Sequence, residues 1–239
     1  MHSNNYTLGF VFIVTVILGT LLSFTKENVR DLQEYNLKAD VKKNILRSLN
    51  FVETESEPWS NEVVERIFNK NVQAFCVNTN GDLVDCILEE VDTERNIEVL
   101  PVYLKVVDNK TEGIAVPVAG KGLWSTVFGY IALEPDTDTV LGIQFYKHGE
   151  TPGLGGEVEK AWFTNNFVGK KIRSNDDKVI GIEVLKGKVD SSNPYSMHQV
   201  DGISGATVTG KGVGSFLKED LGRYESYFNK VKSQRVAGL

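Results

Sequence analysis

The sequence predicts an α+β fold, in which an N-terminal transmembrane helix precedes a mostly antiparallel sheet domain flanked by helices. Three observations support this prediction. An uncharged apolar stretch opens the chain, strand-like segments fill its middle, and segments of helical periodicity stand on both sides of the strands, the last being a long amphipathic helix. The 239 residues suffice for one membrane anchor and one compact domain, or for two small domains.

Composition excludes several classes of protein. The net charge is −6, from 26 Lys and Arg against 32 Asp and Glu, and there is no basic block, which makes nucleic acid a poor partner. A hydrophobic content of 41% excludes wholesale disorder. Two cysteines and three scattered histidines exclude a disulfide-rich scaffold and a four-cysteine or His-rich metal centre, so we expect no metal site.

Residues 1–25 are expected to form the membrane anchor. No charged residue lies between Ser3 and Thr25, and the apolar core at 8–24 spans roughly 26 Å as a helix, close to the ~30 Å of a bilayer's hydrocarbon core. A cleaved signal peptide is the alternative, but the stretch lacks a basic n-region and an A-x-A-like cleavage site. Counting Lys and Arg in the flanks favours a cytoplasmic location for the large domain.

Residues 26–99 are expected to form a helical stalk and a linking region with a hairpin. Apolar residues recur at helical spacing over 26–50, and Ser60 is a candidate N-cap of a second helix after the acidic stretch 53–58. Asn80-Gly81 between two strand-like runs predicts a hairpin. Cys76 and Cys86 flank this turn, and the length of the loop decides between a disulfide and two separate thiols.

Residues 100–239 are expected to form the sheet domain. Strands are predicted at 101–107, 113–118, 126–133, 140–147 and 179–186, and one long amphipathic helix at 211–232.

Three glycine-rich segments interrupt this domain: GKGLWS at 120–125, HGETPGLGGE at 148–157 and DGISGATVTGKGVG at 201–214. Glycine permits positive φ and close approach of the backbone to a ligand, so the segments suggest a bound ligand, although each alone is compatible with an ordinary turn. The third segment runs into the C-terminal helix, whose start favours a phosphate.

Two kinds of chemistry could use this helix start. A P-loop is disfavoured because Gly212 stands where the Mg²⁺-binding hydroxyl of G-x-x-x-x-G-K-[ST] belongs. The alternative is covalent attachment through a hydroxyl of Ser204, Thr207 or Thr209. A threonine is a weak nucleophile and no histidine lies in the segment, so a separate transferase would be needed.

The stretch DGISGAT at 201–207 resembles the flavinylation motif of FMN-binding domains, and GKGLWS and ETPGLGGE match that family in order and spacing. The whole pattern resembles the C subunit of the sodium-translocating NADH:quinone oxidoreductases, densely over 100–232 and weakly over 26–99. The homologous G subunit of Rnf ferredoxin:NAD oxidoreductases is the nearest alternative. One departure is Gly210, where the family usually has serine after T-x-T.

The resemblance implies FMN joined through its phosphate to Thr207 by a magnesium-dependent flavin transferase, with Asp201 and Ser204 as recognition residues. The other cofactor-binding candidates that it implies are Gly205, Ala206, Trp124, Glu150, Thr151, Gly153, Leu154, Gly155 and Lys186. Ordinary alternatives are a core tryptophan for Trp124, a solvated loop carboxylate for Glu150 and a surface lysine for Lys186. No catalytic residue is expected, because the flavin supplies the chemistry.

The function that the resemblance implies is that of an electron-transfer flavoprotein in a redox-driven sodium pump, relaying electrons from NADH towards ubiquinone. Such a chain would be a translocase subunit in the bacterial inner membrane, with its flavin domain on the periplasmic side, opposite to the charge count. The chain lacks G-x-G-x-x-G after a strand, so it is not expected to bind NADH itself. A membrane-anchored binding domain without a redox flavin is a further alternative.

Overall fold

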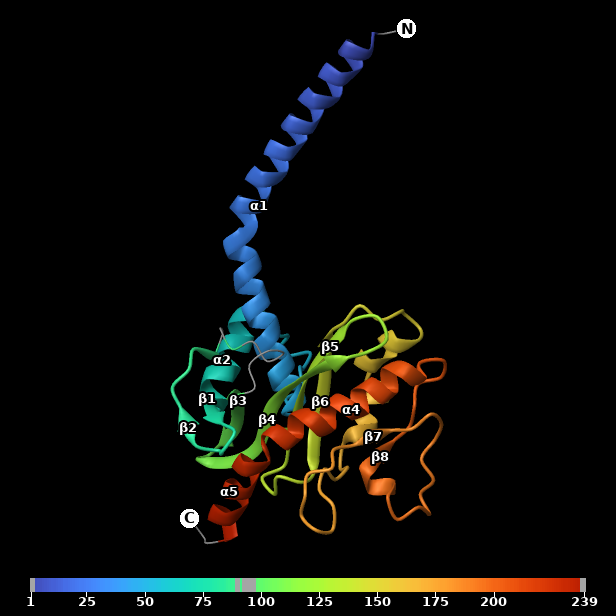
Figure 1. Ribbon diagram of the computed structural model, residues 1–239. Helices are drawn as coiled ribbons and strands as arrows, with labels where there is room; N and C mark the ends of the chain where they lie inside the picture. Colours follow the sequence, from blue (N-terminus) through green and yellow to red (C-terminus); the bar gives the residue numbers. More distant parts are fainter. Residues whose placement is uncertain (1–2, 89–90, 92–97, 237–239) are drawn as a thin grey trace. The chain divides into compact units, whose positions relative to one another are not determined.

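The computed structural model describes residues 3–88, 91 and 98–236, and it divides into two compact units, Met1–Val41 and Lys42–Leu239. The helix α1, Asn4–Ser48, makes up the first unit and continues into the second (Figure 1). The separately expected anchor and stalk are therefore parts of one uninterrupted helix.

In the part of the chain that the structure describes, α1 alone is long and apolar enough to cross a membrane, with a mean hydropathy of 2.3 over its most apolar window. Three threonine hydroxyls in this helix are satisfied locally. The hydroxyls of Thr15, Thr20 and Thr25 each donate to the carbonyl four residues earlier, at 2.9, 2.8 and 2.8 Å. Such bonds remove the cost of leaving hydroxyl donors unpaired in hydrocarbon.

The second unit is built on a six-stranded antiparallel sheet of order β2-β1-β3-β4-β5-β6. The strands are β1 Val72–Asn78, β2 Leu83–Val84, β3 Val99–Val107, β4 Lys110–Lys121, β5 Thr126–Leu133 and β6 Val140–Lys147. The last two have the predicted bounds, and β3 and β4 are longer than predicted. The mostly antiparallel sheet between helices is confirmed.

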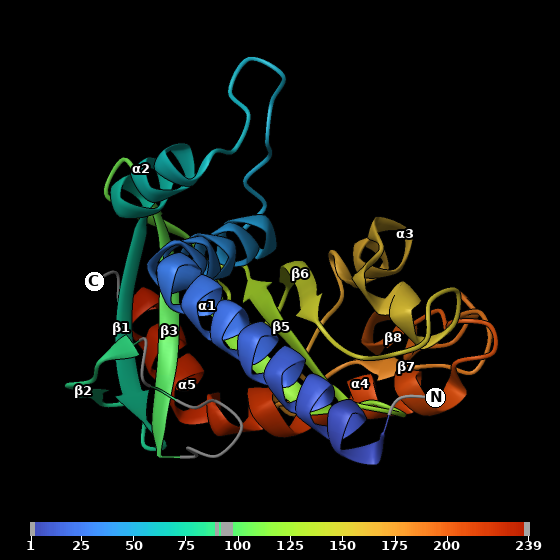
Figure 2. The ribbon, with the colours of Figure 1, turned by 90° about the horizontal axis from the view of Figure 1, so that it is seen from above.

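A small parallel pair, β7 Glu183–Val184 and β8 Gln199–Val200, lies outside this sheet. Together with α3, Ala161–Thr164, it lies on the β6 side of the sheet, opposite to β1 and β2 (Figure 2). The strand predicted at 179–186 was too long, because only two of its residues find a partner strand. Short 3₁₀ helices complete this region: η2 Gly155–Glu159, η3 Asn165–Phe167 and η4 Ser196–His198.

The helix α2, Asn61–Asn71, begins as predicted at Ser60, whose Oγ accepts a hydrogen bond from the N–H of Val63 at 3.3 Å. The predicted helical C-terminal region is confirmed, but it is divided in two. Two helices, α4 Thr207–Arg223 and α5 Glu225–Val236, meet at Tyr224. The glycines near the start of α4 are poor helix formers, and this is why periodicity alone placed its start too late.

Helices cover both faces of the sheet. On one face, Phe216 of α4 meets Phe145 edge to face at 6.3 Å, and a Cβ on Gly120 would lie 2.3 Å from the Cβ of Phe216. The glycine therefore lets α4 sit directly on β4. On the other face, Phe68 of α2 meets Tyr103 at 6.4 Å.

The hairpin at β1 and β2 carries a disulfide between Cys76 and Cys86, with Cα atoms 6.1 Å apart. Cys76 is paired with Val84 in the ladder, and Gly81 in the turn has φ +78°. The N–H of Asn78 donates to the carbonyl of Asp82 at 2.9 Å, so residues 79–81 form the turn and the two cysteines are not directly opposed. Cys86 reaches Cys76 because it follows the paired Val84 by two residues and so approaches the same side of the hairpin.

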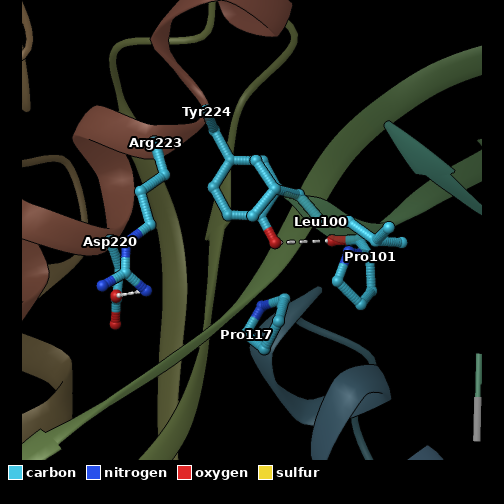
Figure 3. A pocket seen from close by; sticks show the side chains of 7 residues that line it. Leu100, Pro101, Pro117, Asp220, Arg223 and Tyr224 are labelled. Carbon is cyan, nitrogen blue, oxygen red and sulfur yellow. Dashed lines mark hydrogen bonds and ion pairs between the residues drawn. The ribbon is translucent and has the colours of Figure 1, made fainter. Parts of the chain in front are cut away.

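The C-terminal end of α4 closes the place where β3 and β4 diverge (Figure 3). Asp220 is buried, accepts a hydrogen bond from the backbone N–H of Ala119 at 2.8 Å and pairs with Arg223 at 3.0 Å. The hydroxyl of Tyr224 donates to the carbonyl of Pro101 at 2.9 Å. Burial raises the pKa of Asp220 to about 6, and the Ala119 hydrogen bond and the Arg223 charge offset only part of this effect.

Asp220→Asn should change how stability depends on pH. Between the ordinary aspartate pKa of 3.8 and about 6, the folded chain keeps the proton on Asp220 while the unfolded chain has released it. Rising pH therefore favours unfolding of the wild type, by up to about 2–3 kcal/mol between pH 4 and 7. Urea unfolding of the detergent-solubilised chain should show this decline in the wild type and in Glu219→Gln, and a flatter profile in Asp220→Asn. If the wild type and Asp220→Asn differ in free energy of unfolding by the same amount at every pH, the prediction is wrong.

Candidate functional site

The three glycine-rich segments that the sequence singled out converge at the start of α4. A Cβ on Gly155 would lie 2.7 Å from Oγ1 of Thr209, and one on Gly212 would lie 2.2 Å from the carbonyl oxygen of Lys121. These distances are too short for any side chain. Glycine at these positions therefore lets the segments pack against one another.

The carboxylate of Glu150 joins all three segments. Its Oε1 accepts from the backbone N–H groups of Trp124 at 2.8 Å and Ser125 at 3.1 Å. Its Oε2 accepts from the N–H of Leu123 at 3.2 Å and from the hydroxyl of Thr209 at 2.6 Å. Each oxygen of the carboxylate thus has two donors, which is the condition for keeping a charge away from water.

Glu150 is 6% exposed, so its interpretation as a solvated loop carboxylate is wrong. Burial acts to raise its pKa, but the hydrogen bonds from Thr209 and the three backbone N–H groups outweigh it, and the net pKa lies below the ordinary value. A Cβ on Gly122 or Gly155 would lie 2.7 or 2.6 Å from a carboxylate oxygen. Both glycines are required for this close approach.

Apolar side chains stand in solvent around this cluster. Trp124 is 72% exposed, so it is not a core tryptophan. Leu123, Leu154 and Val208 are exposed as well. The side chain of Leu154 packs against the third segment, because a Cβ built on Gly205 would lie 2.7 Å from Cδ2 of Leu154. We call Leu123, Trp124, Leu154 and Val208 the apolar rim.

The three hydroxyls at the helix start differ in their surroundings. Thr209 is buried and donates to Glu150. Thr207, the first residue of α4, is half-buried, and Ser204 is exposed. Neither of these two side chains hydrogen-bonds to a residue within the described ranges. Among these three hydroxyls, Thr207 is therefore the one on the helix that is accessible and has no partner in the described ranges.

The start of α4 has no side-chain cap, because Ala206 occupies the N-cap position. The first helical backbone bond is from Gly210 to Ala206 at 3.0 Å. The N–H groups of residues 207–209 have no acceptor among residues 3–88, 91 and 98–236. Unpaired N–H groups at the positive end of a helix dipole favour an anion such as phosphate.

The remaining candidates have separate settings. Asp201 accepts from the backbone N–H of Val189 at 2.7 Å, so it orders the 187–189 loop. The carbonyl of Thr151 accepts from Leu154 and Gly156 within its own turn, where Gly153 has φ +74°. Lys186 is exposed and lines a groove beside α4, away from the Glu150 cluster.

Two members of the apolar rim, Leu123 and Val208, were missed from the sequence. Each directly adjoins a residue that was singled out, Trp124 and Thr207. Their apolar character was visible, but their exposure follows from the tertiary packing.

Comparisons with known proteins agree with this geometry. Residues 122–221 match the family model described as FMN-binding domain. The C subunit of the Na(+)-translocating NADH-quinone reductase of Vibrio alginolyticus is 32% identical over 240 residues, covering 89% of this chain and 90% of the relative. Its counterpart from Pseudomonas aeruginosa is 45% identical over 122 residues, covering 51% of this chain and 46% of the relative. The crystal structure of the same subunit from Parabacteroides distasonis has a TM-score of 0.73 and 32% identity, covering 84% of this chain and 96% of that chain.

Glu150→Gln should destabilise the second unit by about 2–3 kcal/mol at pH 7, because an amide NH₂ replaces an oxygen that accepts two hydrogen bonds. The folded pKa of Glu150 is lowered, so its stabilisation is present above the unfolded value of 4.5 and is lost as pH falls through the folded value. Urea unfolding should therefore show a large gap from the wild type at pH 7 and a smaller one below pH ~4.

The matched control is Glu159→Gln, whose exposed carboxylate pairs with Lys160 and should contribute less than about 1 kcal/mol. Equal effects of the two substitutions would show that Glu150 does not hold the three segments together.

Proposed function

Because the chain belongs to the family of the C subunits of Na(+)-translocating NADH-quinone reductases, we propose that it carries FMN joined through its phosphate to Thr207. Homologues are subunits of an oxidoreductase complex, and this chain contains the FMN-binding domain. Within such a complex the chain relays electrons that come from NADH towards ubiquinone, as part of a redox-driven sodium pump.

The observation that carries the proposal is the unengaged hydroxyl of Thr207 at the uncapped start of α4. A phosphate bonded to this oxygen would be held by the N–H groups of residues 207–209, which have no acceptor in the described part of the chain, and the helix dipole would stabilise its negative charge. Thr209, two residues on, is bound to Glu150 and buried, and this leaves it a poor acceptor.

The apolar rim supports the position of the ring system. Trp124 and Leu154 come from two different segments and lie in solvent, where large apolar side chains carry a cost unless something covers them. A planar aromatic group tethered at Thr207 would cover part of this surface and leave one edge open. Bound FMN supplies the electron-transfer chemistry, and the protein supplies its position and its electrostatic surroundings.

Attachment requires a separate flavin transferase. His198 is the histidine nearest to Thr207 in sequence, and its Nδ1 lies 2.7 Å from the carbonyl oxygen of Lys171. Because its Nδ1 contacts the Lys171 carbonyl, His198 is not placed to activate the hydroxyl of Thr207. Asp201 and Ser204 remain our proposed recognition residues for the transferase, and Ser204 is exposed enough to be reached.

We also propose that the second unit lies on the periplasmic side of the bacterial inner membrane. The Cys76–Cys86 disulfide supports this, since disulfides persist in the periplasm and are rare in the cytosol. The Lys and Arg count points the other way, but it expresses a bias and not a rule.

Thr207→Ala should abolish covalent flavin. The chain is co-expressed with the transferase, denatured in the dark and separated by gel electrophoresis, and the band is inspected for flavin fluorescence and by intact-mass spectrometry. The wild type should fluoresce. Thr209→Val, which removes the neighbouring hydroxyl, should fluoresce too. If Thr207→Ala still fluoresces, another residue is the flavin acceptor. If the wild-type band carries no flavin, the chain is better explained as a binding domain without a redox flavin.

Membrane topology is checked with single exposed cysteines added to the wild-type chain, at Ser191 in the second unit and at Ser3 before α1. A membrane-impermeant maleimide that reaches the periplasm should label Ser191→Cys in intact cells and Ser3→Cys only after lysis. The reverse pattern would place the second unit in the cytoplasm.

A further inference from the structure

A groove of about 570 Å³ runs between α4 and the segment 180–186, outside the cluster around Glu150. Its lining includes Lys186, Lys211, Lys218, Ser215, Gly214 and Glu183. Lys186 is also a cofactor-binding candidate from the resemblance, whereas Lys211 and Lys218 have no part in the proposed attachment of FMN.

Glycines hold together the two elements that border the groove. A Cβ on Gly210 would lie 3.0 Å from Cγ1 of Val184, and one on Gly181 would lie 2.7 Å from the Cα of Lys218. The segment therefore lies close against α4, and the longer lysine side chains stand along both walls. The groove is thus fixed by backbone packing and does not depend on a mobile loop.

The charge in the groove is unbalanced. Lys186, Lys211 and Lys218 are exposed, and none forms an ion pair with a residue that the structure describes. Two nearby acids are engaged: Glu183 accepts from Gln199 at 2.8 Å, and Glu219 pairs with Arg223 at 2.7 Å. Three lysines against one lining glutamate make a positive site on a chain whose net charge is −6.

The spacing of the lysines suits an extended ligand. Lys211 and Lys218 are seven residues apart on one helix, which is roughly 10 Å along its axis. Carboxylates on one face of an extended segment are separated by roughly 7 Å at two residues and roughly 13 Å at four, and the flexible lysine side chains can reach either spacing. Lys186 on the opposite wall then faces the same segment from the other side.

We propose that this groove docks an acidic segment of a neighbouring subunit of the complex, in contact with Lys186, Lys211 and Lys218. The proposal rests on the proposed function, because the acidic segment belongs to another subunit of the same complex. Charge pairs of this kind fix the register of a partner and speed its association. Lys211 lies one helical turn beyond Thr207, so a partner seated in the groove would be held next to the flavin attachment point.

The test is assembly of the whole complex in its native membrane. Lys211→Glu with Lys218→Glu reverses two charges of the groove, and Lys70→Glu with Lys178→Glu reverses two exposed charges elsewhere. Both pairs change the net charge equally. At physiological salt, the groove variant should retain at least about tenfold less of the other subunits in affinity purification, whereas the control variant matches the wild type. Melting curves establish that both variants fold.

Two further readouts make the outcome decisive. Flavin fluorescence on the denatured band should be the same in the wild type and both variants. Loss of that fluorescence with normal assembly would assign the groove to the flavin transferase and overturn the proposal, as would normal assembly of the groove variant. Binding of inorganic phosphate, but not of a short polyglutamate peptide, to the purified full chain would assign the groove to a small anion instead. A wild-type chain that assembles without covalent flavin would refute the proposed function and leave the docking result standing.

Discussion

A single buried negative charge organises the functional end of this protein. Glu150 is removed from water, and an ionised carboxylate is tolerated there only when donors surround it. The donors come from the GLWS turn and from α4, and the glycines leave room for the carboxylate between them. If the charge were absent, three segments from distant parts of the chain would lose the group that they share. The surface around Thr207 is therefore a consequence of an interaction that lies beneath it.

One helix connects the distinct parts of the second unit. The start of α4 carries Thr207, its Lys211, Gly214 and Lys218 line the groove, and its apolar face packs on the sheet through Phe216. Its last turns place Asp220 and Tyr224 against the diverging strands β3 and β4. The site is thus mounted on an element that is held at both ends, which suits a role in fixing a cofactor at a defined position.

Much of this fold could be predicted from the sequence because the signals were local. The bounds of β5 and β6 follow from apolar runs between turn residues, and the start of α2 follows from Ser60. The features that escaped prediction depend on distant contacts. The break at Tyr224 coincides with a hydrogen bond to Pro101, 123 residues earlier. The role of Glu150 depends on Thr209, 59 residues later, and no spacing rule reveals such a pair. The interpretation of Thr207 came from family resemblance, and the structure adds that its hydroxyl has no hydrogen-bond partner among the residues it describes.

The uncapped start of α4 affects the stability of this helix before a cofactor is attached. A helix that starts at alanine lacks about 1 kcal/mol relative to one started by serine or aspartate. An anion fixed at the first residue takes over the role of the missing cap. Under the proposed attachment at Thr207, the modification would therefore stabilise the helix that carries it.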